Sequence, residues 1–219
     1  MAQNHISLVI DQNTVKADKL PAWVKEQTGV TLIDLVEGSL DKLKEDTCEY
    51  VLFLTEQCEL ESGSLLSAAT AGKGQRLIAL NTAPAGLGLG VYKISAAESG
   101  IYDFFGLNSN VEIRPSAFLI RKDAVDLEKI DPANGDHSVW RMIFDLIREA
   151  EGRVFISATE TMTINKFKGQ MSREQIDKLA GDLEALCRDL EAEHIAVPDY
   201  LLRMIAHRAA RIIENKGSL

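Results

Sequence analysis

Short apolar runs rich in β-branched residues recur through the first part of the chain, and they constrain its fold more than any other feature. Continuous apolar runs of this length are typical of strands buried on both faces. They are HISLVI (5–10), VTLIDLV (30–36), YVLFLT (50–55) and RLIAL (76–80). Segments with the apolar spacing of helices separate them, at residues 16–29, 38–46 and 61–74. This alternation predicts an α/β fold with a mainly parallel, mixed central sheet flanked by helices.

The second part of the chain continues the pattern and then changes character. A strand at 116–121, an acidic loop, a helix at 137–150 and a strand at 153–157 come first. Two amphipathic helices follow, in 171–194 and 197–215, and their junction near Pro198 predicts a C-terminal helical hairpin. We therefore expect an α/β domain over residues 1–160 and a helical extension over 161–219. The hairpin would pack on the domain, on a second copy of the chain or on a partner protein.

Composition narrows the classes of function. The chain has 24 Lys and Arg against 33 Asp and Glu, and its net charge of −9 argues against general nucleic-acid binding, which needs a basic surface. Cys48, Cys58 and Cys187 are too widely spaced for a zinc motif or a disulfide framework, which favours a reducing compartment. We see no signal peptide and no apolar window of about 20 residues for a transmembrane helix. The expected location is the cytoplasm.

Polar residues follow the predicted strands where a parallel sheet usually binds its ligand. Ligands of open α/β sheets bind beyond the carboxyl ends of the strands. Asp11 follows the first strand, Glu37 follows the second, and Thr55 to Glu59 follow the third. We expect the binding site to include side chains from these three places.

The order of these segments resembles that of the family 2 glycosyltransferases, which have the GT-A nucleotide-diphospho-sugar transferase fold. The likeness spans about residues 5–157 and rests on the order of its parts, since no single motif is intact. Three segments carry it: VTLIDLVEGSLDKL, EYVLFLTEQCELESGSLLSAAT and SAFLIRKDAVDLEKIDPANGDHSVWRMIFDLIREAEGRVFIS. The resemblance implies transfer of a sugar from a nucleotide donor to a glycan or envelope-polysaccharide acceptor, with inversion.

The resemblance also implies roles for particular residues at the donor end of the site. Glu37 falls where the family has an aspartate that contacts the nucleobase. Thr55 and Gln57 fall where the family has the aspartates that bind the metal and the diphosphate, so the Asp-x-Asp motif is degenerate here. Mn²⁺ or Mg²⁺ is the cofactor implied, yet a hydroxyl and an amide are poor ligands for such cations. Glu56 and Glu59 are the nearby acids that could bind a metal, and the loss of the usual acids points to a metal-independent or inactive member of such a family.

At the acceptor end, the resemblance assigns catalysis to a carboxylate. Asp136 falls on the second acid of the family's Glu-Asp pair, its usual catalytic base, while Gly135 replaces the first acid. Arg141 falls on the arginine of the following helix. Arg121 and Lys122 match a pair of basic residues that ends a strand, and they could neutralise the diphosphate in place of a metal.

The residues by themselves leave alternatives open. Asp136 could be the N-cap of helix 137–150 as well as a base. Arg121 and Lys122 could simply end a strand at the surface. Two other functions compete with transfer: a catalytically inactive GT-A-like module for binding or assembly, and an unrelated α/β protein that dimerises through its C-terminal helices.

Overall fold

The computed structural model describes much of the chain and divides it into two compact units, Met1–Phe167 and Lys168–Leu219. The described residues are 6–10, 30–34, 40–55, 58–61, 63–84, 96–104, 114–132, 135–164, 173–192, 199, 202, 203, 205, 206, 209 and 210. The helix expected at 16–29 and the turn expected near Pro198 lie outside them. Strand β8 of the first unit runs across residue 160 to Ile164. The domain division at residue 160 stays a prediction.

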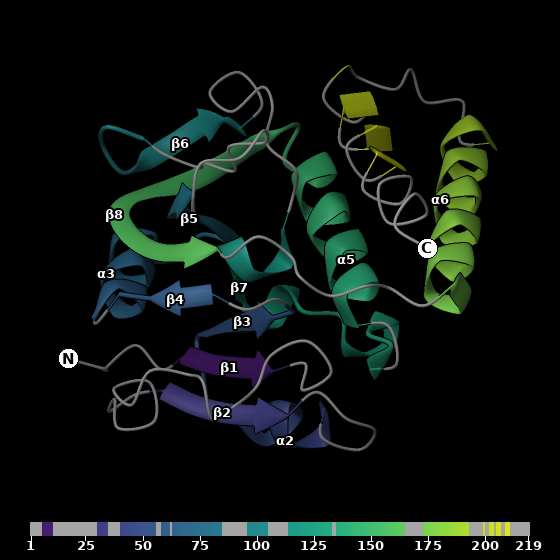
Figure 1. The fold of residues 1–219 in the computed structure, drawn as a ribbon. Coiled ribbons are helices and arrows are strands. Elements are labelled where there is room, and N and C mark those ends of the chain that lie inside the picture. Colours follow the sequence, from purple (N-terminus) through teal and green to yellow (C-terminus); the bar gives the residue numbers. More distant parts are fainter. Residues whose placement is uncertain are drawn as a thin grey trace. The chain divides into compact units, whose positions relative to one another are not determined.

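The described strands of the first unit form one mixed sheet with the order β2-β1-β3-β7-β5-β8-β4, and β6 also pairs with β8 (Figure 1). The register gives β1, β2, β3, β5 and β8 one direction, and β4, β6 and β7 the other. The predicted mainly parallel, mixed sheet is therefore confirmed. The strands are β1 (Ile6–Ile10), β2 (Val30–Asp34), β3 (Tyr50–Leu54), β4 (Cys58–Leu60), β5 (Leu77–Pro84), β6 (Gly100–Asp103), β7 (Phe118–Arg121) and β8 (Arg153–Ile164).

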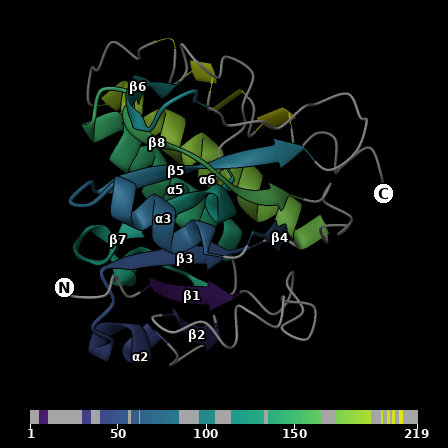
Figure 2. The ribbon, with the colours of Figure 1, turned by 90° about the vertical axis from the view of Figure 1, so that its left-hand side faces the viewer.

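Helices cover both faces of this sheet. The described helices of the unit are α2 (Leu40–Glu45), α3 (Ser64–Ala71) and α5 (Gly135–Glu149). Tyr50 donates a hydrogen bond to the carbonyl of Gly72 at the end of α3, whereas Thr55 bonds to Asp136 of α5. Successive strand residues point to opposite faces, so residues five apart do as well. Helices α3 and α5 therefore lie on opposite sides, with α3 in front of the sheet in Figure 2.

Burial of the central strands explains why their sequences are so apolar. Every residue of β1 and of β3 is buried, because helices or loops cover both faces. Helix α5 adds a wide apolar face that includes Trp140, Phe144 and Ile147. The core thus lies between the sheet and its helices.

The second unit contains one long described helix, α6 (Arg173–Ala192). Leu183, Leu186 and Leu190 are buried, which agrees with the apolar face that their spacing predicts. Across the residues with described structure, we find no helix that is both long and apolar enough to cross a bilayer.

Candidate functional site

A hydrogen bond between two predicted site residues marks the candidate site. Thr55, which directly follows β3 and is 1% exposed, donates from Oγ1 to Oδ1 of Asp136 over 3.0 Å. Asp136 lies in the first turn of α5 and is half-buried. The two residues are 81 positions apart in the chain, so only the fold brings them together. The site combines a fixed hydroxyl with a carboxylate that solvent can reach.

Ser116 fixes the end of β3 and thereby the position of Thr55. The backbone N–H of Thr55 donates to Oγ of Ser116 over 3.1 Å, and Ser116 is fully buried. Ser116 belongs to the 3-10 helix η2 (Pro115–Ala117), which directly precedes β7. Since β7 is antiparallel to β3 and Leu119 lies opposite Leu52, the start of β7 adjoins the end of β3. This role of Ser116 was not predictable from the sequence, because it depends on the direction of β7.

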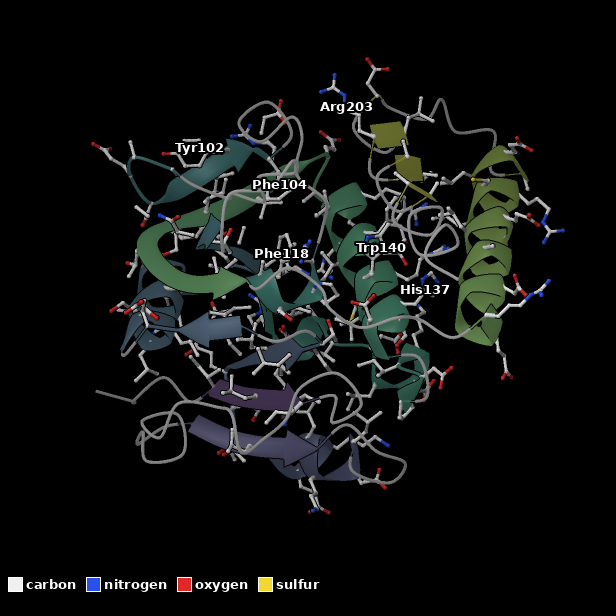
Figure 3. All side chains as sticks on the ribbon, in the orientation of Figure 1. Tyr102, Phe104, Phe118, His137, Trp140 and Arg203 are labelled. Atoms are coloured by element: carbon white, nitrogen blue, oxygen red, sulfur yellow. The ribbon has the colours of Figure 1, made fainter. Side chains whose placement is uncertain are left out.

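Helix α5 begins at Gly135, two residues earlier than expected. Asp136 is therefore inside the first turn, and the interpretation of Asp136 as the residue that precedes the helix is corrected. The partial positive charge at a helix N-terminus favours an anionic side chain in this turn. His137 is buried and stacks on Trp140 with 5.9 Å between ring centroids, as Figure 3 allows the reader to follow along α5. Both rings are buried, so this side of the first turn faces the core.

The pair lies close to the point where the order of the strands in the sheet reverses. Strand β1 has β2 on one side and β3 on the other, so the connection order reverses there. Such a reversal is where open α/β sheets bind ligands, beyond the carboxyl ends of the strands. Ile10 lies opposite Leu54, and we call the side of the sheet where β1 and β3 end the carboxyl edge. Thr55 is the next residue along this edge.

The remaining candidates after the parallel strands lie beyond the part of the chain that the structure describes. This applies to Asp11, Glu37, Glu56 and Gln57, while Glu59 lies in β4 and only its backbone is described. Their contribution to the site stays a prediction.

Arg121 and Lys122 lie at the opposite side of the sheet, which we call the amino edge. Arg121 pairs with Tyr50, the first residue of β3, because β7 runs antiparallel to β3. At about 3.3 Å per strand residue, the five positions from Tyr50 to Thr55 span about 17 Å. We expected Arg121 and Lys122 to share a site with Thr55, and this topology corrects that expectation. The proposed site therefore does not include Arg121 or Lys122.

Both residues have structural partners at the amino edge. Arg121 donates from Nη1 to the carbonyl of Gly74 over 2.6 Å and from Nε to Oδ1 of Asp123 over 2.6 Å. The hydrogen bond from Arg121 lowers the pKa of the Asp123 carboxyl. Lys122 donates from Nζ to the carbonyl of Lys44 over 3.0 Å and also to that of Asp46, beyond the end of α2. These bonds join the end of β7 to neighbouring turns.

Arg141 also points away from the Thr55–Asp136 pair. It is five residues after Asp136, which corresponds to a rotation of about 140° around the helix axis. Its Nε lies 3.5 Å from Oδ2 of Asp145, and its guanidinium is 6.0 Å from the ring centroid of Phe144. The structure thus places Arg141 on another face of α5.

One cation that sequence reasoning missed adjoins the carboxyl edge. Arg114 directly precedes η2, and its carbonyl accepts a hydrogen bond from the N–H of Ala117 over 2.9 Å. Two residues span at most about 7 Å, so the Cα of Arg114 lies within that distance of the Cα of Ser116. Arg114 is half-buried, and its Nε is buried. Only the antiparallel direction of β7 brings it to this side of the sheet.

Thr55 is a poorer ligand for a divalent metal than the aspartate whose place it takes. Its hydroxyl donates a hydrogen bond to Asp136, whereas Mn²⁺ and Mg²⁺ prefer anionic or carbonyl oxygens. Within the described ranges, no three Asp, Glu, His or Cys side chains are grouped as a metal site would require.

Comparison with known proteins leaves the family open. No family model matches the sequence, and no curated protein matches it. Among solved structures, the chain is similar to residues 1–349 of S. aureus TarS in complex with UDP, with 12% sequence identity and a TM-score of 0.46. The match covers 81% of this chain and 54% of that one, so the chain spans about half of that structure's length. The α/β fold stated above rests on the chain's own strand order and register.

Proposed function

We propose that the chain is an inverting glycosyltransferase that moves a sugar from a nucleotide-diphospho-sugar to a hydroxyl group of a glycan. The observation that carries the proposal is the Asp136 carboxylate, which Thr55 fixes beside the carboxyl edge of the sheet. A crevice at the reversal of strand order suits a nucleotide, and a carboxylate beside it suits a general base. The order of segments that resembles the family 2 glycosyltransferases gives the same assignment to Asp136.

Asp136 has the chemistry that inversion requires. In this reaction the acceptor hydroxyl attacks the anomeric carbon on the face opposite to the diphosphate. The new carbon–oxygen bond forms, the bond to the diphosphate oxygen breaks, and its electron pair leaves with the nucleoside diphosphate. Asp136 takes the proton of the acceptor hydroxyl. A carboxylate has about four lone-pair positions, so the bond from Thr55 orients the group and still allows it to accept a proton.

Residues beyond the described structure complete the proposed donor site. Asp11 follows β1, which ends beside β3, and Glu37 and Gln57 follow strands of the same direction. We propose that these three contact the nucleotide and its sugar. The nucleobase and ribose then bind beyond the carboxyl ends of β1 and β3.

A thermal-shift screen tests the donor site. UDP, GDP, CDP, dTDP and ADP are each added with Mn²⁺, Mg²⁺ or EDTA. A ligand at a hundred times its dissociation constant stabilises the folded chain by about 2.7 kcal/mol, which a melting curve detects. We expect one nucleotide to raise the melting temperature in EDTA. If none of the five nucleotides raises the melting temperature with Mn²⁺, with Mg²⁺ or with EDTA, the proposal is wrong.

A turnover assay then tests the role of Asp136. The sugar ester of the selected nucleotide is supplied, and release of the nucleoside diphosphate is followed for the wild type, Asp136→Asn and the matched control Asp145→Asn. Loss of a general base lowers turnover by about 10²- to 10⁴-fold. We expect this for Asp136→Asn alone, with its nucleotide affinity retained. Nucleotide binding without any turnover by the wild type would instead identify a binding module.

A further inference from the structure

We propose that Arg114 is the cation that binds the donor's diphosphate and stabilises its charge as it leaves. This inference rests on the proposed function and names a residue that the resemblance does not assign. It follows from where the antiparallel strand β7 begins.

The distribution of positive charge along the sheet points to Arg114. Within the described residues, four cations adjoin strand ends at the amino edge. Arg76 precedes β5, Arg153 begins β8, Arg121 ends β7 and Lys122 follows it. Arg114 instead precedes the start of β7, which lies at the carboxyl edge. The ligand site of such a sheet is at that edge. Arg114 is therefore placed to meet an anion bound there.

The backbone fixes Arg114 relative to the Thr55–Asp136 pair. The proline that follows restricts Arg114 to an extended conformation, and its φ of −111° and ψ of 121° agree with this. The bond from the N–H of Ala117 to the Arg114 carbonyl closes η2 behind it. Ser116, inside η2, then holds the backbone of Thr55, whose side chain holds Asp136. One short segment thus positions both a cation and a base.

The chemistry of a guanidinium suits this role. Its planar fork binds phosphate oxygens through two parallel hydrogen bonds and stays protonated at all relevant pH values. A positive charge aimed at the departing diphosphate stabilises the transition state as well as the bound donor.

Isothermal titration tests the inference on the full chain. The nucleoside diphosphate that binds the wild type most tightly in the five-nucleotide screen, and its parent nucleoside, are titrated into the wild type, Arg114→Gln, Arg114→Lys and Arg153→Gln. Arg153 is exposed at the start of β8 and serves as the control. Removing a charge-assisted hydrogen bond weakens binding by about 10- to 100-fold. We expect Arg114→Gln to lose that much affinity for the diphosphate and none for the nucleoside.

The outcomes separate this inference from the proposed function. Unchanged diphosphate affinity in Arg114→Gln, with wild-type binding intact, overturns the role of Arg114 and leaves the transferase proposal standing. Equal losses for the diphosphate and the nucleoside also overturn it, since they indicate a damaged site. Absence of any nucleotide binding by the wild type overturns both. Arg114→Lys keeps the positive charge without the planar fork, so we expect its affinity to fall several-fold for the diphosphate only. Wild-type affinity for the diphosphate in this variant contradicts the inference, even if Arg114→Gln fails to fold.

Discussion

Replacing Thr55 with valine removes the hydrogen bond that defines the site and keeps the shape of the side chain. A hydrogen bond to a charged group contributes about 1.5 to 3 kcal/mol. Thr55 is 1% exposed, so water cannot replace its hydroxyl, but Asp136 is only half-buried and can recover part of the loss from solvent. We therefore expect the low end, a decrease of about 1.5 kcal/mol in the free energy of unfolding. With an m-value of about 2 kcal/mol per molar, the urea midpoint falls by about 0.75 M.

A double-mutant cycle with Asp136→Ala isolates the pair. Asp136→Ala loses the same bond and about 0.3 to 1 kcal/mol of interaction with the helix dipole. If the bond is as the structure shows, the two effects are not additive, and the coupling is about 1.5 kcal/mol. Thr70→Val is the matched control, because the hydroxyl of Thr70 donates to the carbonyl of Leu66 within α3. Additivity within about 0.5 kcal/mol for Thr55→Val and Asp136→Ala would refute the reasoning.

Three further predictions concern the amino edge. Lys122→Met should lower the free energy of unfolding by about 1 kcal/mol, because the carbonyls of Lys44 and Asp46 lose their donor. Its nucleotide affinity should not change, and weaker binding in a titration would show that Lys122 belongs to the nucleotide site. Burial raises the pKa of the Cys48 thiol from its ordinary 9.0. The stabilisation from the neutral thiol is therefore present below pH 9 and is lost as the pH rises further. Cys48→Ala should flatten the stability–pH curve above pH 9, and an unchanged curve would contradict the raised pKa. Arg121 lowers the pKa of the Asp123 carboxyl from 3.8, so this contribution to stability is present above pH 3.8 and is lost as the pH falls through the lower folded-state value. Asp123→Asn should therefore reduce the loss of stability in acid, and an unchanged acid limb of the stability–pH curve would contradict this.

The apolar runs were sufficient to predict most of the central strands. YVLFLT became β3 with its expected start at Tyr50, because a run buried on both faces has few other places in a fold. The strand expected at 153–157 continues to Ile164, however. Its later part, ATETMTI, has threonine at every second position and lacks a continuous apolar run, and it is stabilised by pairing with β4 and β5. The three-residue strand β4 has no local signal of its own and depends on that pairing.

The candidate site was predictable in part, and the limit has one cause. Thr55 and Asp136 were both named from the sequence, and the fold joins them by a hydrogen bond. The direction of β7 was not predictable, since short apolar strands look alike whichever way they run. That direction moves Arg121 away from the site and brings Ser116 and Arg114 toward it. Association through the C-terminal helices stays a prediction.

The most direct test of the account measures nucleotide binding and turnover together for Asp136→Asn. Isothermal titration gives its affinity for the nucleoside diphosphate selected by the thermal-shift screen, and the release assay gives its rate with the corresponding nucleotide sugar. The account predicts wild-type affinity and a rate about 10²- to 10⁴-fold below that of the wild type. A variant that binds and turns over like the wild type would contradict the assignment of Asp136 as the base.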